Sequence, residues 1–316
     1  MSEAAIIERY FRHLGAVRTD VILGIGDDAA LLRPQAGCEL AHTTDSLVEQ
    51  RHFLPGSPPR SLGHRALAVN LSDLAAMGAS PAWALLSLTL PQIDESWLGE
   101  FTLGFGMLAR EHGVALVGGN LSRGPLSVTV QLTGQVASGT ALRRSGGQPG
   151  DELWVSGTVG DAALGREPSS GSGGADWHWL RARFEYPTPR VALGEALRGV
   201  ASACIDLSDG LQTDLPRLAA ASGCGAELDV GLVPASAALR ALLGESAWQR
   251  AFQGGEDYEL CFAAAPERAV ALQELAGRFA VPLSRCGRLR GKLGVELLRG
   301  GDVIQFSQSP FDHFAA

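Results

Sequence analysis

The most informative segment for predicting the fold is Leu67-Ala68-Val69-Asn70-Leu71-Ser72-Asp73-Leu74-Ala75-Ala76-Met77-Gly78. It closes a predicted helix over residues 60–77, because the helical pattern stops at a glycine and Pro81 follows soon after. An apolar, strand-favouring run over 82–90 comes next. The elements expected after it are a helix over 95–112, a short buried strand over 114–117 and a strand over 126–136. Alternation of helices and strands is typical of α/β or α+β folds.

The second half of the chain continues this alternation after a turn signal, Gln-Pro-Gly-Asp, at residues 148–151. We place a domain boundary there, between an N-terminal domain of residues 1–147 and a C-terminal domain of residues 148–316. The strands expected in the C-terminal domain cover residues 152–156, 203–207, 260–264 and 295–298. A helix is expected over 209–222. The chain of 316 residues is long enough for two such domains.

The composition is that of a compact globular protein, with 46% apolar and 19% charged residues. A net charge of −8 and the lack of any basic run argue against binding to nucleic acid. No apolar stretch approaches the length of a membrane span, and the N-terminus does not resemble a signal peptide. The five cysteines are scattered without CxxC spacing, which is typical of reduced thiols. We therefore expect a cytoplasmic protein that binds neither nucleic acid nor membranes.

The common phosphate-binding and kinase motifs are absent. The chain has no G-x-x-x-x-G-K-[ST] loop and no protein-kinase signature set. Lys292 is the only lysine, so a phosphate-binding lysine in the middle of the chain is excluded. Arg144, just before Ser145-Gly146-Gly147, is a candidate phosphate clamp, although an ordinary surface arginine explains it equally well.

Several acidic residues stand in unusual places. Asp73 lies among apolar residues in a helix interior, where an unpaired carboxylate is costly. Its partner should be a base or a metal ion, and we favour a metal because Arg65, two turns away, is the nearest base on that helix. Asp206 and Asp45 each stand at the end of a predicted strand. Carboxylates gathered with few bases are typical ligands of hard divalent cations, and magnesium is expected where phosphates complete the shell.

Structural explanations stay open for some of these acids. Asp27 and Asp28 follow Gly26, where an aspartate that caps a turn is the simpler interpretation of the pair. Ser208 or Asp209 would serve well as the N-cap of the helix that follows. A helix cap does not account for Asp206, whose side chain would lie free at the strand end.

Taken together in chain order, these segments resemble the motifs of the thiamine-monophosphate kinase family, over nearly the whole chain. The matching segments are Gly24–Ala30, Thr44–Val48, His52-Phe53, Ala66–Ala79, Asp206–Leu211, Gly254–Leu260 and Phe311–Phe314. The family shares a superfamily with aminoimidazole ribonucleotide synthetase and selenophosphate synthetase. The resemblance implies two α/β domains, of which the N-terminal one is a ferredoxin-like sheet domain that pairs in a homodimer.

The resemblance also implies a reaction. ATP and thiamine phosphate would give ADP and thiamine diphosphate by direct, Mg²⁺-assisted phosphoryl transfer without a phosphoenzyme. By position, the residues that match the family's magnesium ligands are Asp28, Thr43, Thr44, Asp45, Asp73, Asp206 and Asp209. The matches to its ATP contacts are Gly119, Arg144 and Ser208, and those to its substrate contacts are His52, Glu256 and Phe311. A phosphate oxygen is already an anionic nucleophile, so no residue is assigned as a general base.

The chain departs from the family pattern at one position. Many members have Gly-Gly-Asp-Thr where this chain has Gly118-Gly119-Asn120-Leu121. Asn120 still offers an oxygen but no charge, so we keep it among the expected ATP-site and metal-binding residues. One metal would then bind more weakly or depend on its other ligands. Two other classes of function stay open. One is an ATP-dependent synthetase or ligase of the same superfamily, and the other is a non-catalytic nucleotide- or metal-binding relative.

Overall fold

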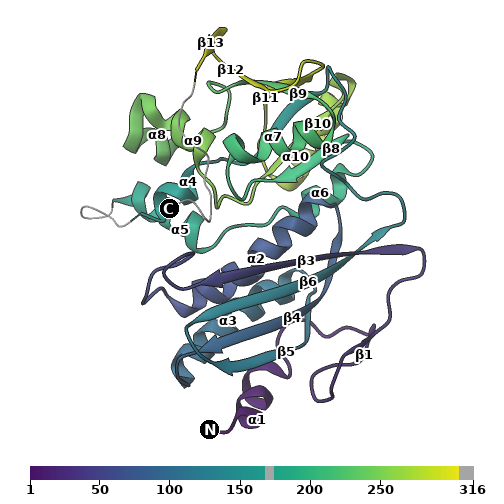
Figure 1. The fold of residues 1–316 in the computed structure, drawn as a ribbon, viewed down its shortest axis with the longest axis vertical. Helices are drawn as coiled ribbons and strands as arrows, with labels where there is room; N and C mark the ends of the chain where they lie inside the picture. Colours follow the sequence, from purple (N-terminus) through teal and green to yellow (C-terminus); the bar gives the residue numbers. More distant parts are fainter. Residues whose placement is uncertain (168–173, 306–316) are drawn as a thin grey trace. The chain divides into compact units, whose positions relative to one another are not determined.

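The structure is a computed structural model that describes residues 1–167 and 174–305 (Figure 1). The chain forms two compact units. The first unit comprises Met1–Leu74 and Ala79–Gly139, and the second comprises Ala75–Gly78 and the chain from Thr140 onward. The domain boundary expected between residues 147 and 148 stays a prediction.

The elements up to residue 137 are, in chain order, α1 (Glu3–Ile6), the π-helical turn η1 (Ile7–Phe11), β1 (Val21–Leu23), β2 (Leu31–Leu32), β3 (Cys38–Val48), α2 (Pro59–Ala76), β4 (Ser80–Leu90), α3 (Glu95–Glu111), β5 (Ala115–Arg123) and β6 (Ser127–Ala137). The later helices are α4 (Asp161–Gly165), α5 (Ala175–Glu185), α6 (Val191–Leu197), α7 (Leu211–Ala221), α8 (Ala237–Leu243), α9 (Ala247–Gln253) and α10 (Ala269–Phe279), with short 3₁₀ turns at η2 (Gly244–Ser246) and η3 (Pro266–Arg268). The later strands are β7 (Glu152–Ser156), β8 (Ala203–Asp206), β9 (Gly225–Asp229), β10 (Leu260–Ala264), β11 (Leu283–Arg290), β12 (Val295–Arg299) and β13 (Asp302–Ile304).

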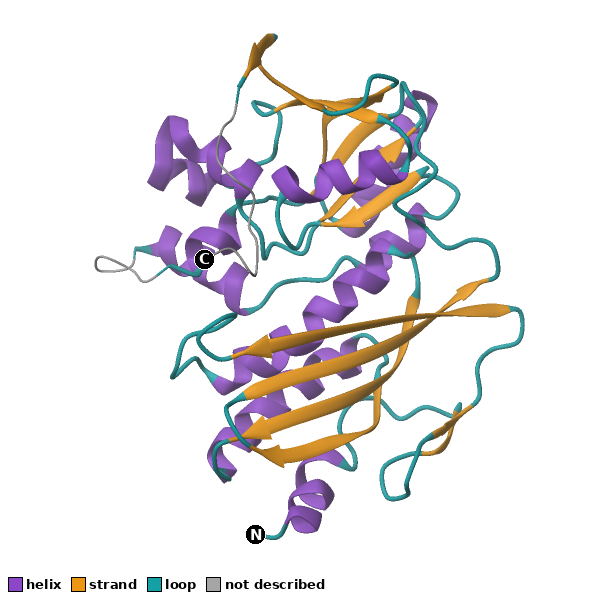
Figure 2. Ribbon diagram, viewed as in Figure 1, coloured by secondary structure: helices purple, strands orange, loops and turns teal. Residues whose placement is uncertain are grey.

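A four-stranded sheet in the order β3-β6-β4-β5 is the centre of the first unit. Helices α2 and α3 lie along one face of it (Figure 2). Helix α2 forms as the sequence predicts: Leu67, Leu71 and Leu74 recur at helical spacing and are at most 1% exposed. Asp94 is the N-cap of helix α3, and its carboxylate accepts the backbone N–H groups of residues 96 and 97 at 2.9 and 3.0 Å.

The other face of this sheet is partly open. Alternation along β6 buries Val128, Val130 and Leu132 on the helix-covered side, so the residues between them point to the opposite side. Over β4 and β5 this face is covered by the N-terminal segment: Val21, Ala30 and Leu32 pack on a cluster formed by Ala82, Trp83, Ala115 and Val117. Over β3 it stays exposed, and Leu40 is 41% accessible there. We call this exposed part the open face.

The second unit contains a seven-stranded sheet in the order β13-β12-β9-β11-β7-β10-β8. All neighbouring strands are antiparallel except β12 and β9. Its core joins apolar residues of the sheet, such as Leu153 and Ile205, to residues of helix α7, such as Leu215 and Leu218. Strands β8 and β10 lie at one edge, and the chain segments that follow β8 and precede β10 carry the predicted site residues of this unit.

The expected helices and strands are present, but one strand is longer than predicted. The strand predicted over 114–117 runs on to Arg123, so Gly118 and Gly119 lie inside β5. Pairing between β4 and β5 shifts at residues 84 and 85, which is the irregularity that a β-bulge produces. The two glycines hid this continuation, because glycine ordinarily weakens a strand pattern. None of the helices in the described ranges has the length and apolar character needed to cross a membrane.

Candidate active site

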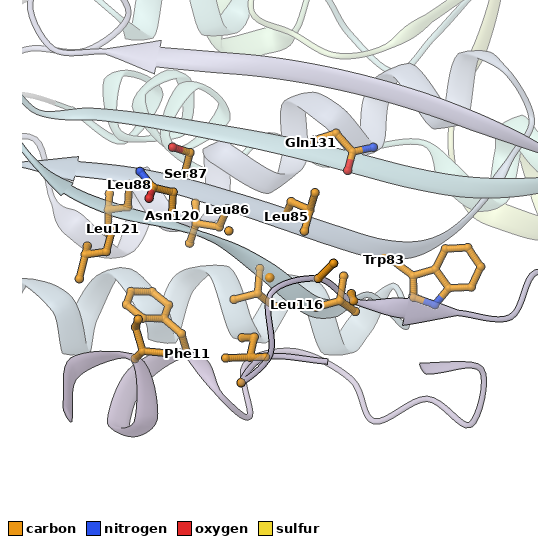
Figure 3. A pocket seen from close by; sticks show the side chains of 18 of the residues that line it. Phe11, Trp83, Leu85, Leu86, Ser87, Leu88, Leu116, Asn120, Leu121 and Gln131 are labelled. Atoms are coloured by element: carbon orange, nitrogen blue, oxygen red, sulfur yellow. The ribbon is translucent and has the colours of Figure 1, made fainter. Parts of the chain in front are cut away.

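A pocket of about 850 Å³ lies in the first unit, between strands β4 to β6 and the N-terminal segment that covers them (Figure 3). Its wall is largely apolar, with Phe11 and Leu116 among the residues shown. Three predicted site residues line it: Asp28, Gly119 and Asn120. They come from chain segments about ninety residues apart, so the fold brings together what the sequence only marked separately.

Gly119 is required where it stands. Its φ is 150°, and a Cβ atom there would lie 1.9 Å from the carbonyl oxygen of Leu86 on the neighbouring strand. A side chain at this position would therefore push β4 and β5 apart. Asn120 follows directly and pairs in register with Ser87 of β4. The glycine allows the two strands to approach closely at the wall of the pocket.

The segment that covers the pocket is held by an ion pair and an indole hydrogen bond that the sequence analysis did not predict. The Arg18 guanidinium donates to both carboxylate oxygens of Asp20, with a shortest distance of 2.6 Å, and the Trp83 indole N–H donates to Asp20 at 3.0 Å. The Arg18 hydrogen bonds, helped by that of Trp83, lower the pKa of Asp20. Arg12 ties the loop between β1 and β2 by donating to the carbonyl oxygen of Ile25 at 3.0 Å. Both contacts hold the segment that carries Asp28.

The remaining predicted ligands of the first unit divide between the two faces of its sheet. The hydroxyl of Thr43 donates to the Asp73 carboxylate, which joins β3 to the middle of α2. Asp45, two residues further along β3, points to the same face by alternation. Thr44 points to the opposite face, and its hydroxyl donates to the Val130 carbonyl oxygen at 3.2 Å. The structure therefore groups Thr43 with Asp73 and separates Thr44 from them.

His52 lies in the loop after β3. Its Nδ1 accepts the backbone N–H of Val48 at 3.1 Å, so one ring nitrogen serves to close the loop. Arg65, the base nearest to Asp73 along α2, is 2% exposed and donates to the His52 carbonyl oxygen at 3.4 Å. Arg65 thus supports the loop that carries His52.

In the second unit, Asp206 ends strand β8 and is 4% exposed. Asp209 receives a hydrogen bond from Arg217 of α7 at 2.7 Å, and the same guanidinium nitrogen donates to Asp214 at 2.9 Å. Burial raises the pKa of Asp214 to about 6, although its hydrogen bonds act in the other direction. The sequence analysis did not predict Asp214 and Arg217 as site residues, because an acid and a base three residues apart on a helix are typical of an ordinary surface pair.

The suggestion that Ser208 or Asp209 caps helix α7 was wrong. The N-cap is Gly210, with a φ of 91° and no capping side chain. The carboxylate of Asp214 accepts the backbone N–H of Asp209 at 2.9 Å instead. The side chains of Ser208 and Asp209 are therefore not used as the helix cap.

Glu256 lies beside Ser208. Its backbone N–H donates to the Ser208 carbonyl oxygen at 2.8 Å, and the Tyr258 hydroxyl donates to the Glu256 carboxylate at 3.0 Å. Gly255 permits this approach, because a Cβ there would lie 2.4 Å from the Ser208 carbonyl oxygen. The structure thus joins one predicted ATP contact to one predicted substrate contact.

The other acids of the same motif, Asp257 and Glu259, are buried and hydrogen-bonded within the unit. Asp257 accepts the backbone N–H groups of Gly160 and Ala162 at 2.5 and 3.0 Å, at the start of α4. Burial raises the pKa of Asp257 to about 7 against the effect of those bonds. Burial alone would lower the pKa of Arg190, but its hydrogen bonds and charge interaction with Glu259 raise it.

Two predicted residues remain apart from these groups. Arg144 is exposed, and its backbone oxygen accepts the Ser222 hydroxyl at 2.9 Å. An exposed guanidinium is compatible with a phosphate clamp as well as with a surface arginine. Phe311 lies outside the described residues.

The metal site stays a prediction. Across the described ranges, no three His, Cys, Asp or Glu side chains lie close enough together to hold a metal ion by themselves. Magnesium, however, commonly binds through one or two carboxylates and completes its shell with substrate phosphates and water. The predicted ligands are all oxygen donors, and the Thr43–Asp73 pair fits a site of that kind.

Comparison with known proteins agrees with both the sequence motifs and the fold. The AIR synthase related protein N-terminal domain matches residues 26–136, and the corresponding C-terminal domain matches residues 148–298. Thiamine-monophosphate kinase of Salmonella typhimurium (strain LT2) is 45% identical over 319 residues, which cover 99% of this chain and 98% of that protein.

Two solved structures show the same likeness. The crystal structure of thiamine-monophosphate kinase from Stenotrophomonas maltophilia K279a has a TM-score of 0.85 and 47% identity, covering 91% of this chain and 93% of that one. AaThiL complexed with AMPPCP and TMP has a TM-score of 0.79 and 31% identity, covering 92% of each chain. The chain belongs to the thiamine-monophosphate kinase family.

Proposed function

We propose that this protein uses ATP to phosphorylate thiamine phosphate, giving ADP and thiamine diphosphate. Curated relatives that match this chain over almost their whole length are named for that activity. One solved neighbour was complexed with AMPPCP and TMP. The observation within this chain that carries the proposal is the pocket of the first unit. It brings Gly119 and Asn120, expected to contact ATP, together with Asp28, an expected magnesium ligand.

In this proposal the pocket receives the nucleotide. Its apolar wall suits a flat, uncharged base, and Asn120 and Gln131 offer polar groups for orientation. In the second unit, the loop before β10 carries Glu256, the expected contact of thiamine phosphate. Arg144, which is exposed, would bind a phosphate through its planar fork of donors.

Magnesium is the metal that these oxygen donors favour. In the first unit, carboxylates are offered by Asp28, Asp45 and Asp73 and neutral oxygens by Thr43, Thr44 and Asn120. In the second unit, Asp206 and Asp209 offer carboxylates. A bound magnesium ion would neutralise charge that develops on the transferred phosphoryl group. The protein's own contribution is to hold the two anionic reactants in line and to exclude water, and no side chain has to act as a general base.

A homodimer is part of the same proposal. The open face exposes Leu40 beside the polar residues of β3 and β6, and a second copy of the chain bound there would cover this leucine. We also place the protein in the cytoplasm, in keeping with five free cysteines, of which four are buried.

A coupled assay of ADP release tests the reaction. Purified protein with magnesium and ATP should release ADP with thiamine phosphate and form thiamine diphosphate, and it should not react with free thiamine. ADP release that forms another product would favour a synthetase or ligase. ATP binding without turnover would favour a non-catalytic relative.

A further inference from the structure

The loop between α9 and β10 contains two residues in an unusual backbone conformation. Glu256 and Tyr258 have φ angles of 69° and 54°, in the left-handed region. This region is unfavourable for residues that carry a Cβ atom, so neighbouring contacts have to maintain it. Conformations of this kind gather at functional sites, where surrounding structure holds them.

On one side, the loop is bound to the segment after β8. Glu256 donates its backbone N–H to the Ser208 carbonyl oxygen at 2.8 Å, and Tyr258 donates to the Leu207 carbonyl oxygen at 3.0 Å. The Tyr258 hydroxyl then fixes the Glu256 carboxylate at 3.0 Å. The direction of the Glu256 side chain therefore depends on the left-handed conformation of both residues.

On the other side, Asp257 and Glu259 anchor the loop in the interior of the unit. Glu259 is fully buried and receives two hydrogen bonds from Arg190, at 2.7 and 2.5 Å, and one from Arg183 at 2.9 Å. The Ser156 hydroxyl donates to Glu259 at 2.6 Å. Asp257 binds the first turn of α4. Asp257, Tyr258 and Glu259 are thus buried, while Glu256 stays partly exposed.

The chemistry of this cluster favours a geometric role over a purely stabilising one. Buried ion pairs contribute little net stability relative to well-packed apolar residues, because both charges lose their hydration. A bidentate arginine–carboxylate pair, however, fixes distance and orientation. The cluster of Arg183, Glu259 and Arg190 holds the buried end of this loop. It is therefore well suited to fix the direction of the Glu256 side chain in the same loop.

We propose that the buried Arg183–Glu259–Arg190 cluster, together with Asp257, is a positioning unit that holds Glu256 against Ser208 in the orientation that thiamine phosphate requires. None of these four residues is proposed to touch substrate. The inference rests on the proposed function, in which Glu256 contacts the substrate, and it extends that function to residues buried beneath the site.

The first test is Arg190→Lys, which keeps the charge but loses the planar, two-pronged geometry. The KM for thiamine phosphate should rise about tenfold, since small misplacements of binding groups cause losses of this order or more. The KM for ATP should stay unchanged. Tyr258→Phe, which removes only the hydroxyl that fixes Glu256, should raise the same KM by a smaller factor and serves if Arg190→Lys does not fold.

Two control variants separate positioning from loss of stability. Leu297→Ala creates a cavity in β12, four strands from β10, and should lower the melting temperature without changing either KM. Arg285→Lys makes the same chemical change in an exposed ion pair with Glu152 and should have no effect. If Arg190→Lys and Tyr258→Phe behave like Leu297→Ala, the positioning role is refuted.

Amide hydrogen exchange provides a readout that does not depend on activity. In Arg190→Lys, the backbone N–H groups of Glu256 and Tyr258 should exchange faster relative to those of strand β7, and in Leu297→Ala they should not. Unchanged protection of both amides in Arg190→Lys would overturn the inference. A wild-type protein without thiamine phosphate kinase activity would refute the proposed function instead, and the exchange experiment would still decide whether the cluster holds the loop.

Discussion

The acidic residues that first drew attention divide into groups with different surroundings. Thr43 and Asp73 share a hydrogen bond on the helix-covered face of the first sheet, and Asp209 shares Arg217 with the buried Asp214. Asp257 and Glu259 are internal anchors. A carboxylate that binds metal and one that anchors a loop have the same chemical formula, so their contacts decide which role each can have.

Asp73 is the residue for which the metal role can be tested most directly. Asp73→Asn keeps the size of the side chain and an oxygen that can accept from Thr43, but removes the charge that magnesium requires. The variant should stay folded and lose turnover by at least about a hundredfold. Steady-state kinetics and a melting curve check this, with Asp302→Asn on the exposed strand β13 as a control. Near-normal turnover in Asp73→Asn would make the carboxylate a packing residue.

Asn120 tests the departure from the family pattern. Asn120→Asp adds a negative charge to the pocket wall beside Gly119, so magnesium should reach half-maximal activity at a lower concentration. Ser122→Asp, two residues further along β5 and exposed, controls for a general effect of added charge. Equal magnesium titrations for wild type and Asn120→Asp would show that this position does not touch the metal.

At the scale of elements, the strands and helices hold the predicted site residues in position. Strand β5 contributes Gly119 and Asn120 because its close pairing with β4 continues past the glycines. The start of helix α4 is bound by Asp257, whose carboxylate accepts two of its early N–H groups. Because this contact depends on the Asp257 carboxylate, its contribution to the free energy of unfolding should change with pH.

The pH dependence follows from the raised pKa of Asp257. Its pKa is about 7 in the folded protein, because burial outweighs the two N–H bonds, and about 3.9 in an unfolded chain. Between these values the folded state binds more protons than the unfolded state, so this group's contribution to stability is full below about pH 4 and is lost as pH rises to about 7. Arg183 and Asp161 act on the same group in opposite directions.

The side chain in Asp257→Asn cannot ionise, so the variant should lack this pH-dependent contribution to the free energy of unfolding. The free energy of unfolding, measured by denaturant between pH 5 and pH 8, should fall more with rising pH in the wild type than in the variant. Parallel curves for the two proteins would assign the pH dependence to other groups.

At the scale of the whole molecule, each unit has its own sheet and core, and the confirmed family membership agrees with this two-domain α/β organisation. The open face of the first unit is the surface at which we propose that a second copy of the chain binds. Leu40 is 41% exposed there, on an edge strand that carries His42 and Thr44 on the same side.

The proposed homodimer makes a measurable claim about this surface. The wild type should have twice the chain mass of 33.1 kDa by light scattering, and Leu40→Glu should shift it toward the monomer by placing a charge in the contact. Leu103→Glu, a matched change on helix α3 at 38% exposure, should leave the dimer intact. A monomeric wild type would rule out the dimer, and equal effects of both variants would place the contact elsewhere.

The amino-acid sequence alone was enough to predict the main helices and strands, because the spacing of apolar residues is a local property, and helix α2 and strand β7 follow it without help from distant segments. It also determined the family, since its motifs are ordered along the chain. It did not determine that β5 continues through two glycines, that Asp20 holds Trp83, or that Asp257 and Glu259 turn inward while Glu256 does not. Those outcomes depend on partners far away in the chain, such as Gly160, Arg183 and Arg190, and only the folded chain brings these groups within hydrogen-bonding distance.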